Sequence, residues 1–424
     1  MILIMKRYQD CQRIKDLGMV VPFTNSERMN FACPRLWTLS NVECFDEDHH
    51  SDAITYGTIW HSFLEMILLE MRDNDSTLSE ERLLQIVDTQ LKSFIENELI
   101  EIGGDGYLQE YIMFDKLDDV FVRIRNGVIG WMVSWVSVMD DYRILEIELP
   151  IAAPVIDQFG DIARFDFFVV NEGEFLRPAC SSEAVTAQKM RLPFWKVGKA
   201  DVLLECRRTG DLWVCDHKTT SVPSSFDSAI PYDIQLPSYA YLLQYEIEKG
   251  ALTKYKGKKI GGIFYDIVKS NISSQPKLLK KGGLSKAKNS GVCSWVYKQA
   301  VLKHKLPMSE YRNHITFLKN NVDARHFLHR FLHLTPSDLD RCSAEDYAIA
   351  SQIAKKRSEL VNINKYSYKA DFNVIAYRFP LCQRYGNCRF SSICIANTHP
   401  AVITINSNPQ IKWVASENKN EFPF

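Results

Sequence analysis

The residues best suited to chemistry are two aspartates and a lysine. Asp201 ends the run Gly198-Lys199-Ala200-Asp201, and Asp216 opens the run Asp216-His217-Lys218-Thr219. Paired carboxylates repel one another unless a cation lies between them, and hard oxygen ligands suit Mg²⁺ or Mn²⁺. A nearby ammonium can orient water or stabilise the charge that develops on a phosphate. The pattern predicts metal-assisted phosphodiester hydrolysis; an ordinary surface cluster of ion pairs is the alternative.

A β-hairpin is expected to bring these residues together. The strand-like runs 202–205 and 212–215 flank a segment with the composition of a turn. A turn placed symmetrically between the runs puts Asp201 directly opposite Asp216, with β-carbons about 5 Å apart. Because side chains in a strand alternate with a period of two, Lys218 shares the face of Asp216.

The remaining pattern favours one mixed α/β domain. Apolar spacing and turn composition predict these elements: mostly helix from Thr55 to about Asp140, strand Arg143–Ile151, helix Gln235–Lys249, strand Ile260–Val268 and helices over about Ser294–Asn364. The order helix, sheet, helix predicts a central mixed β-sheet flanked by helices.

Composition is that of an ordinary folded protein. Of the 424 residues, 46% are hydrophobic and 24% are charged, and no apolar stretch reaches the length of a bilayer span. Residues 1–8 have the wrong order of apolar and basic residues for a secretory signal, so we expect a cytoplasmic protein. The net charge of −1 provides no global basic field for a nucleic acid.

Four motifs resemble those of the RecB-like nucleases of the PD-(D/E)xK superfamily. Gly198–Asp201 looks like "G-[RK]-x-D" and Asp216–Thr219 looks like "D-[YH]-K-T". Gln235–Leu242 is similar to "Q-L-x-x-Y-A-Y-L", and Gly57–Glu65 is similar to "G-x-x-x-H-x-x-L-E". The motifs occur in the order of the family, and the resemblance extends over nearly the whole chain.

The resemblance implies a role for each matching residue. Asp201, Asp216 and His61 would bind the metal, Lys218 would be the catalytic lysine, and Gln235 and Tyr239 would line the catalytic site. Gln235 and Tyr239 are spaced i and i+4, which puts them on one helix face. A core histidine paired with Glu65 is the alternative for His61, and plain packing is the alternative for Tyr239.

An acidic strand position of the family has two candidates in this chain. Glu148, in Ile147-Glu148-Leu149-Pro150, matches it weakly, and Glu146 competes for the same place. The residues alone do not decide between the two.

A lysine-rich segment from residue 267 to 308 contains nine lysines and no Asp or Glu. Part of it resembles a segment of phage-type members of the family. Lys280, Lys281, Lys286 and Lys288 could hold DNA phosphates without reading sequence. The alternative is a solvated loop.

The eleven cysteines suggest a metal rather than disulfides in a reducing cytosol. Cys33 stands in Cys33-Pro34-Arg35, and Cys382, Cys388 and Cys394 lie near the C-terminus. The set resembles the iron-sulfur subset of RecB-like nucleases, which implies a [4Fe-4S] cluster. The commonest spacing of that subset, C-x2-C-x5-C, is not kept, because Tyr385 stands in place of its first cysteine. Zinc on the same thiolates and unliganded cysteines are the alternatives.

The expected organisation is a single nuclease domain over residues 26–398. Its parts are a helical insertion at about 62–140, a catalytic core at about 143–270, the lysine-rich loop 267–308 and a helical region with the cysteine cluster at 294–398. An N-terminal extension (1–25) and a C-terminal tail (399–424) flank it.

The expected function is hydrolysis of single-stranded or end-bearing DNA with Mg²⁺ or Mn²⁺. An exonuclease is favoured over an endonuclease because no sequence-reading module is visible. The chain has no phosphate-binding motif of an ATP motor, so a separate helicase or a replication or recombination protein would have to open duplex. The rival functions are a nuclease-like DNA-binding protein that does not cut and a zinc-stapled interaction protein.

Overall fold

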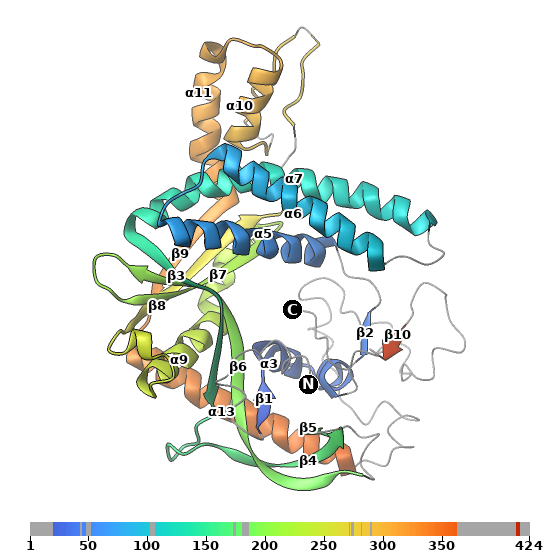
Figure 1. The fold of residues 1–424 in the computed structure, drawn as a ribbon, viewed down its shortest axis with the longest axis vertical. Helices are drawn as coiled ribbons and strands as arrows, with labels where there is room; N and C mark the ends of the chain where they lie inside the picture. Colours follow the sequence, from blue (N-terminus) through green and yellow to red (C-terminus); the bar gives the residue numbers. More distant parts are fainter. Residues whose placement is uncertain are drawn as a thin grey trace.

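A mixed β-sheet with helices on both faces forms the centre of the molecule (Figure 1). The computed structural model describes residues 20–42, 45–47, 52–101, 107–172, 175–179, 186–270, 272, 275–280, 282–288, 291–362 and 413–415. The expected α/β class, with a central mixed sheet flanked by helices, is confirmed.

The strands vary greatly in length. They are β1 (Val21–Phe23), β2 (Phe45–Glu47), β3 (Tyr142–Pro154), β4 (Arg164–Glu172), β5 (Phe175–Pro178), β6 (Gln188–Cys206), β7 (Leu212–Thr220), β8 (Ile260–Lys269), β9 (Phe327–His333) and β10 (Trp413–Ala415). Eight of them form one sheet in the order β5-β4-β6-β7-β8-β9, with β1 and β3 also paired to β6. β2 and β10 form a separate antiparallel pair.

The long strand β6 organises the sheet. It pairs antiparallel with β3, β4 and β7 and parallel with β1, and β7 pairs parallel with β8. The hairpin of β6 and β7 has the expected register, since Val202 pairs with Cys215 and Glu205 with Leu212. The first half of β6 and the strands β4 and β5 were not predicted from the sequence.

Helices cover the two faces of the sheet and extend beyond it. They are α3 (Asn25–Phe31), α4 (Pro34–Trp37), η1 (Thr38–Val42), α5 (Asp52–Asn74), α6 (Glu80–Glu101), α7 (Tyr107–Asp141), α8 (Pro223–Ala229), η3 (Ile230–Tyr232), α9 (Gln235–Glu248), η4 (Thr253–Tyr255), α10 (Ser294–Lys303), α11 (Met308–Leu318), η5 (Lys319–Asp323), α12 (Ala324–His326) and α13 (Pro336–Asn362). Within the described ranges, no helix is long and apolar enough to cross a membrane.

Two of the apolar cores fix helices to opposite faces of β7 and β8. On one face α5, α6 and α7 bury large side chains, including Trp60, Trp131 and Trp135, against β7 and β8. On the other face α9 packs Leu236, Ala240 and Leu243 on the same strands. The side chains of β7 alternate between the two cores, so each strand residue is committed to one face.

The prediction of helix throughout residues 294–364 is wrong at 327–333. Phe327–His333 forms the strand β9, which pairs antiparallel with β8. Phe331 stacks on Phe264 with ring centroids 4.2 Å apart. An edge strand of this length is decided by its partner strand, which local periodicity does not reveal.

A buried ionic network ties four distant segments together. Asp346 of α13 accepts hydrogen bonds at 2.6 Å from both Lys196 of β6 and Arg28 of α3. It also accepts one at 3.2 Å from the Ser238 hydroxyl of α9. The side chains of Lys196 and Asp346 are only 1% and 2% exposed, so neither charge is solvated by water.

We expect Asp346→Ala to lower the free energy of unfolding by about 3–5 kcal/mol, because it leaves Lys196 buried without its partner. Urea unfolding followed by circular dichroism measures this. Asp340→Ala, at an exposed position of the same helix, should stay within about 0.5 kcal/mol of the wild type. Equal unfolding midpoints for the Asp346 and Asp340 variants would show that the network is not structural.

Candidate active site

The candidate site lies where β6 and β7 separate. The last paired residues of the hairpin are Val202 and Cys215, and Asp201 and Asp216 are the next residue on each strand. Beyond this point β7 continues along β8 as far as the pair Thr220 and Lys269. The peptide N–H of His217 donates to the Asp201 carboxylate at 2.8 Å, so a side chain takes over the hydrogen bond there. The two aspartates therefore line a fork in the sheet.

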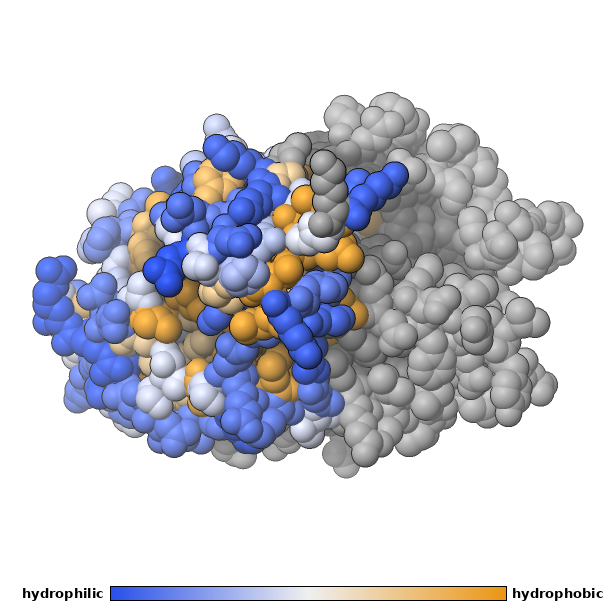
Figure 2. All heavy atoms as spheres, turned by 90° about the horizontal axis from the view of Figure 1, so that it is seen from above, coloured by the Kyte–Doolittle hydropathy of each residue, from blue (hydrophilic) through white to orange (hydrophobic). Residues whose placement is uncertain are grey.

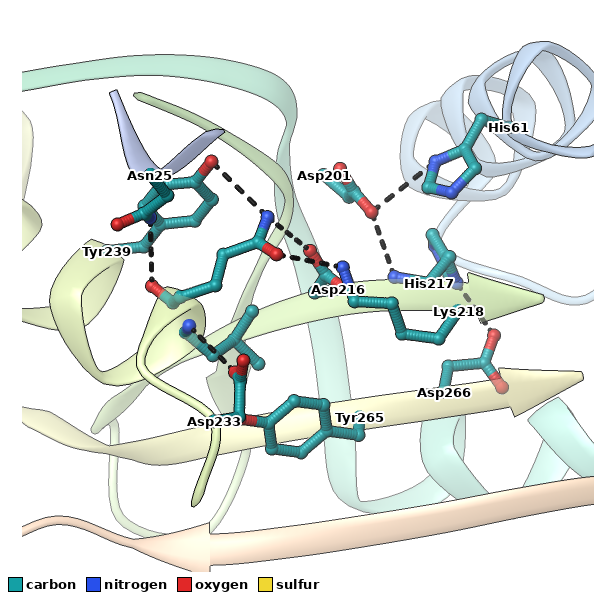
Figure 3. Close-up of polar contacts among 12 residues, drawn as sticks. Asn25, His61, Asp201, Asp216, His217, Lys218, Asp233, Tyr239, Tyr265 and Asp266 are labelled. Carbon is teal, nitrogen blue, oxygen red and sulfur yellow. Dashed lines mark hydrogen bonds and ion pairs between the residues drawn. The ribbon is translucent and has the colours of Figure 1, made fainter. Parts of the chain in front are cut away.

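Gln235, at the start of α9, connects Asp216 and Lys218 of β7 with Tyr239 of α9 (Figure 3). Its amide oxygen accepts from Lys218 Nζ at 3.1 Å, and its amide nitrogen donates at 3.4 Å to both Asp216 and the Tyr239 hydroxyl. Lys218 Nζ lies 2.6 Å from Asp216 Oδ2. The structure thus brings Asp216, Lys218, Gln235 and Tyr239 into one network.

Gly198 makes room for Tyr239. A β-carbon added at Gly198 would lie 2.4 Å from the Tyr239 ring, which is far inside any normal contact. The ring therefore lies directly against the backbone of β6. Any larger residue at this position would push Tyr239, and with it Gln235, out of place.

Three potential metal ligands converge on the other side of the fork. One ligand atom each from His61, Glu148 and Asp201 lies within 4.8 Å of the others. His61 Nδ1 is 3.5 Å from Asp201 Oδ2. One nitrogen and two carboxylates form a donor set that fits Mn²⁺ or Mg²⁺. Asp216 lies outside this group, so its role as a ligand stays a prediction.

Glu148 is the candidate ligand that the sequence left undecided. Its φ of 54° is in the left-handed region, which costs about 1–2 kcal/mol for a residue with a β-carbon. Its neighbours Ile147 and Leu149 pair with Val202 and Ala200, so Glu148 stands level with Asp201. Glu146 instead accepts a hydrogen bond from Tyr255 and pairs with Lys254, away from the group. Glu148 also forms an ion pair with Lys199.

Burial sets the charge state of the site. It lowers the pKa of His61, although Asp201 opposes the shift, so the imidazole is neutral and can offer a lone pair. Burial raises the pKa of Asp216 to about 7, against the effect of Lys218. For Lys218, burial acts to lower the pKa, but the carboxylates of Asp216 and Asp201 raise it overall. The lysine therefore keeps its charge beside an acid that holds its proton more tightly than a free aspartic acid does.

A second buried carboxylate supports β7 on the face of the sheet that α7 covers. Asp266 of β8 is fully buried and accepts hydrogen bonds at 2.7 Å from both the His217 ring and Trp131 Nε1. His329 of β9 lies 3.3 Å from its other oxygen. Asp266 was not predicted from the sequence, although a lone acid inside the apolar run of β8 is a signal that a buried partner exists.

The lysine-rich segment begins in β8, where Ile267 pairs with Lys218, and then leaves the sheet. Its residues 284–288 pack on α10 and α11, which project beyond α7 at the end of the molecule away from α9 (Figure 1). Lys286 Nζ donates to the Glu310 carbonyl at 2.8 Å, and Lys288 Nζ lies 5.1 Å from the centroid of the Phe317 ring. Lys280 is exposed, and Lys281 lies outside the described residues. Seen from above, this side is mainly hydrophilic with apolar patches (Figure 2).

Only one of the four predicted cluster cysteines can be described. Cys33 is buried just before α4. Cys382, Cys388 and Cys394 lie outside the described residues.

The affinity for Mn²⁺ should depend on pH through Asp216, if this residue binds the ion as predicted. Its carboxyl must lose a proton, so affinity should fall about tenfold per pH unit below its pKa of about 7 and level off above it. Calorimetry in buffers of different ionisation enthalpy measures both the affinity and the proton release. Asp216→Asn should bind more weakly without this pH dependence, and a wild type with constant affinity and no proton release would refute the role.

Comparison with known proteins agrees with this geometry. The sequence model of the PD-(D/E)XK nuclease superfamily matches residues 31–394, which include every residue of the fork. No curated protein matches the chain. A match over most of the chain, together with the assembled acids and lysine, shows that the chain belongs to the PD-(D/E)XK nuclease superfamily.

Proposed function

We propose that this protein is an Mg²⁺- or Mn²⁺-dependent deoxyribonuclease of the RecB-like branch, in its phage-type, iron-sulfur-containing subset. The observation that carries the proposal is the grouping of His61, Glu148 and Asp201 beside the Asp216–Lys218 pair. A divalent ion bound there supplies Lewis-acid stabilisation of the charge on the phosphoryl oxygens. Superfamily membership makes DNA the expected substrate.

Some residues of the fork would bind the metal ion, and others would orient the reacting groups. Lys218 keeps its proton, so its ammonium can face the phosphate or orient the attacking water. The Gln235 amide oxygen accepts a hydrogen bond from that ammonium and holds it in place, and Tyr239 in turn holds Gln235. Asp201 is held by the His217 peptide, which directs its carboxylate toward His61. Preorganised groups of this kind lose little free energy in reaching the transition state.

An exonuclease acting on single-stranded or end-bearing DNA fits this chain better than a site-specific endonuclease. The chain has no motif of an ATP motor, so duplex would reach the fork through a separate helicase or a replication or recombination protein. A nuclease assay with circular and linear single strands separates the two modes, since an exonuclease leaves the circle intact.

We expect Asp216→Ala to lower the rate of DNA cleavage at least about 100-fold, because it removes the carboxylate that positions Lys218. End-labelled single- and double-stranded DNA with Mg²⁺ or Mn²⁺ is the assay, and a chelator should stop the wild-type reaction. Asp161→Ala, at an exposed turn, is the matched control.

Two results would contradict the proposal. Equal cleavage by the wild type and a folded Asp216→Ala variant would assign the activity to a contaminant. DNA binding with no cleavage under any divalent ion would favour the nuclease-like binding protein instead.

The lysines just before α10, namely Lys280, Lys281, Lys286 and Lys288, are proposed to hold the phosphate backbone. The exposed Lys280, Lys286 and Lys288 have no carboxylate partner in the described part of the chain, so their charges are available to a polyanion. Replacing all three with Gln should reduce the slope of log affinity against log salt, on single strands, by about 0.7 for each phosphate that a lysine no longer neutralises. Exposed Lys256 and Lys259, replaced with Gln, form the control pair. An unchanged slope in the triple variant would refute this role of the lysines.

A [4Fe-4S] cluster held by Cys33, Cys382, Cys388 and Cys394 is the proposed structural cofactor. The superfamily match begins two residues before Cys33 and ends on Cys394, so both proposed anchor points lie inside it. Protein purified without oxygen should be brown with about four irons per chain, and Cys33→Ser should lose colour and iron. A colourless protein with about one zinc per chain would support the zinc-stapled alternative.

A further inference from the structure

The connection between β7 and α9 is tied to the fork at both ends. Residues 219–234 start directly after Lys218 and stop directly before Gln235, and these two side chains hydrogen-bond to each other. Tyr232 stands three residues before Gln235, so its backbone lies within about 11 Å of the Gln235 backbone. Tyr232 is therefore within reach of a strand whose phosphate lies at the fork.

Tyr232 is exposed without a structural reason. Its exposed fraction is 81%, the highest among the large apolar side chains of the described residues. Its ring makes no aromatic contact and its hydroxyl no hydrogen bond with any residue that the structure describes. The tyrosines of the fork region differ from it, since Tyr239 is 8% exposed and Tyr265 is buried. A ring of this size in water contributes little to the stability of the fold.

Buried contacts and hydrogen bonds hold the turn that carries Tyr232 in place. Ile230 is 6% exposed, and Pro231 fixes the backbone between it and Tyr232. The Asp233 N–H donates to the Ile230 carbonyl at 3.0 Å. The Asp233 carboxylate accepts from the Tyr265 hydroxyl at 2.6 Å and from the Leu236 N–H at 3.2 Å (Figure 3). The ring is thus presented on a rigid support, which reduces the entropy lost when a ligand binds to it.

We propose that Tyr232 forms a stacking subsite for an unpaired nucleobase near the scissile phosphate, and that it makes the fork select single-stranded over duplex ends. The inference rests on the proposed nuclease function. A flat aromatic face suits any nucleobase, because every base has a π-face, and it needs no base-specific hydrogen bond. In duplex DNA both faces of an internal base are already stacked, so the subsite offers an advantage only to unpaired strands.

The test measures affinity for a labelled single strand and for its blunt duplex by fluorescence anisotropy, with Ca²⁺ as the metal. Tyr232→Ala should weaken single-strand binding by about 5-fold to 150-fold and leave duplex binding nearly unchanged. Tyr232→Phe keeps the ring and should bind like the wild type. Phe159→Ala is the matched control, because Phe159 is 80% exposed on the turn between β3 and β4.

Abasic oligonucleotides locate the subsite. When one base at a time is removed near the labelled end, the wild type should lose affinity at one position, and Tyr232→Ala should show no loss at that position. Unchanged single-strand affinity in Tyr232→Ala, or the same loss in Tyr232→Phe, would overturn the inference. That failure is distinct from failure of the proposed function, since cleavage that depends on Asp216 would persist.

Discussion

The separation of β6 and β7 is the constraint on which the site depends. As long as two strands stay paired, their peptide groups satisfy one another and leave no room for a ligand. Beyond Val202 and Cys215 the pairing stops, and the Asp201 carboxylate accepts the hydrogen bond that the His217 peptide would otherwise give to the backbone of β6. The Asp201 carboxylate thus replaces a backbone carbonyl as the acceptor at the point where the two strands separate. A cation is what makes such a concentration of negative charge favourable.

The surrounding structure keeps the fork open at a fixed width. On one face, Gly57 of α5 approaches Thr219 of β7, where an added β-carbon would lie 3.2 Å from the threonine hydroxyl. On the other face, Gly198 admits the Tyr239 ring against β6. Behind the strand, Asp266 anchors the His217 ring. The two glycines of the motifs are therefore spacing residues, and the His217 ring points to Asp266 with its centroid 6.1 Å from that of His61.

Two of the groups of buried charges have different roles. The network of Lys196, Arg28 and Asp346 is closed, with each charge paired, and it links α3 and α13 to the sheet. The fork is incomplete, since burial leaves Asp216 with a raised pKa even beside Lys218. A closed network stabilises the fold, whereas an incomplete one binds a ligand that completes it.

The sequence alone determined the parts of this site that are local. Alternation along the strands and a symmetric turn predicted that Asp201 and Asp216 would be neighbours, and helical spacing put Gln235 and Tyr239 on one face. Tertiary structure decided the rest. Only the bulged pairing of β3 with β6 selects Glu148 over Glu146. In a regular strand, two acids that are two residues apart point to the same face, so the sequence cannot distinguish them. The irregular register and the left-handed backbone of Glu148 give the two side chains different directions. Likewise β9 and Asp266 depend on partners 49 or more residues away in sequence, and contacts at that separation leave no periodic signal in the chain.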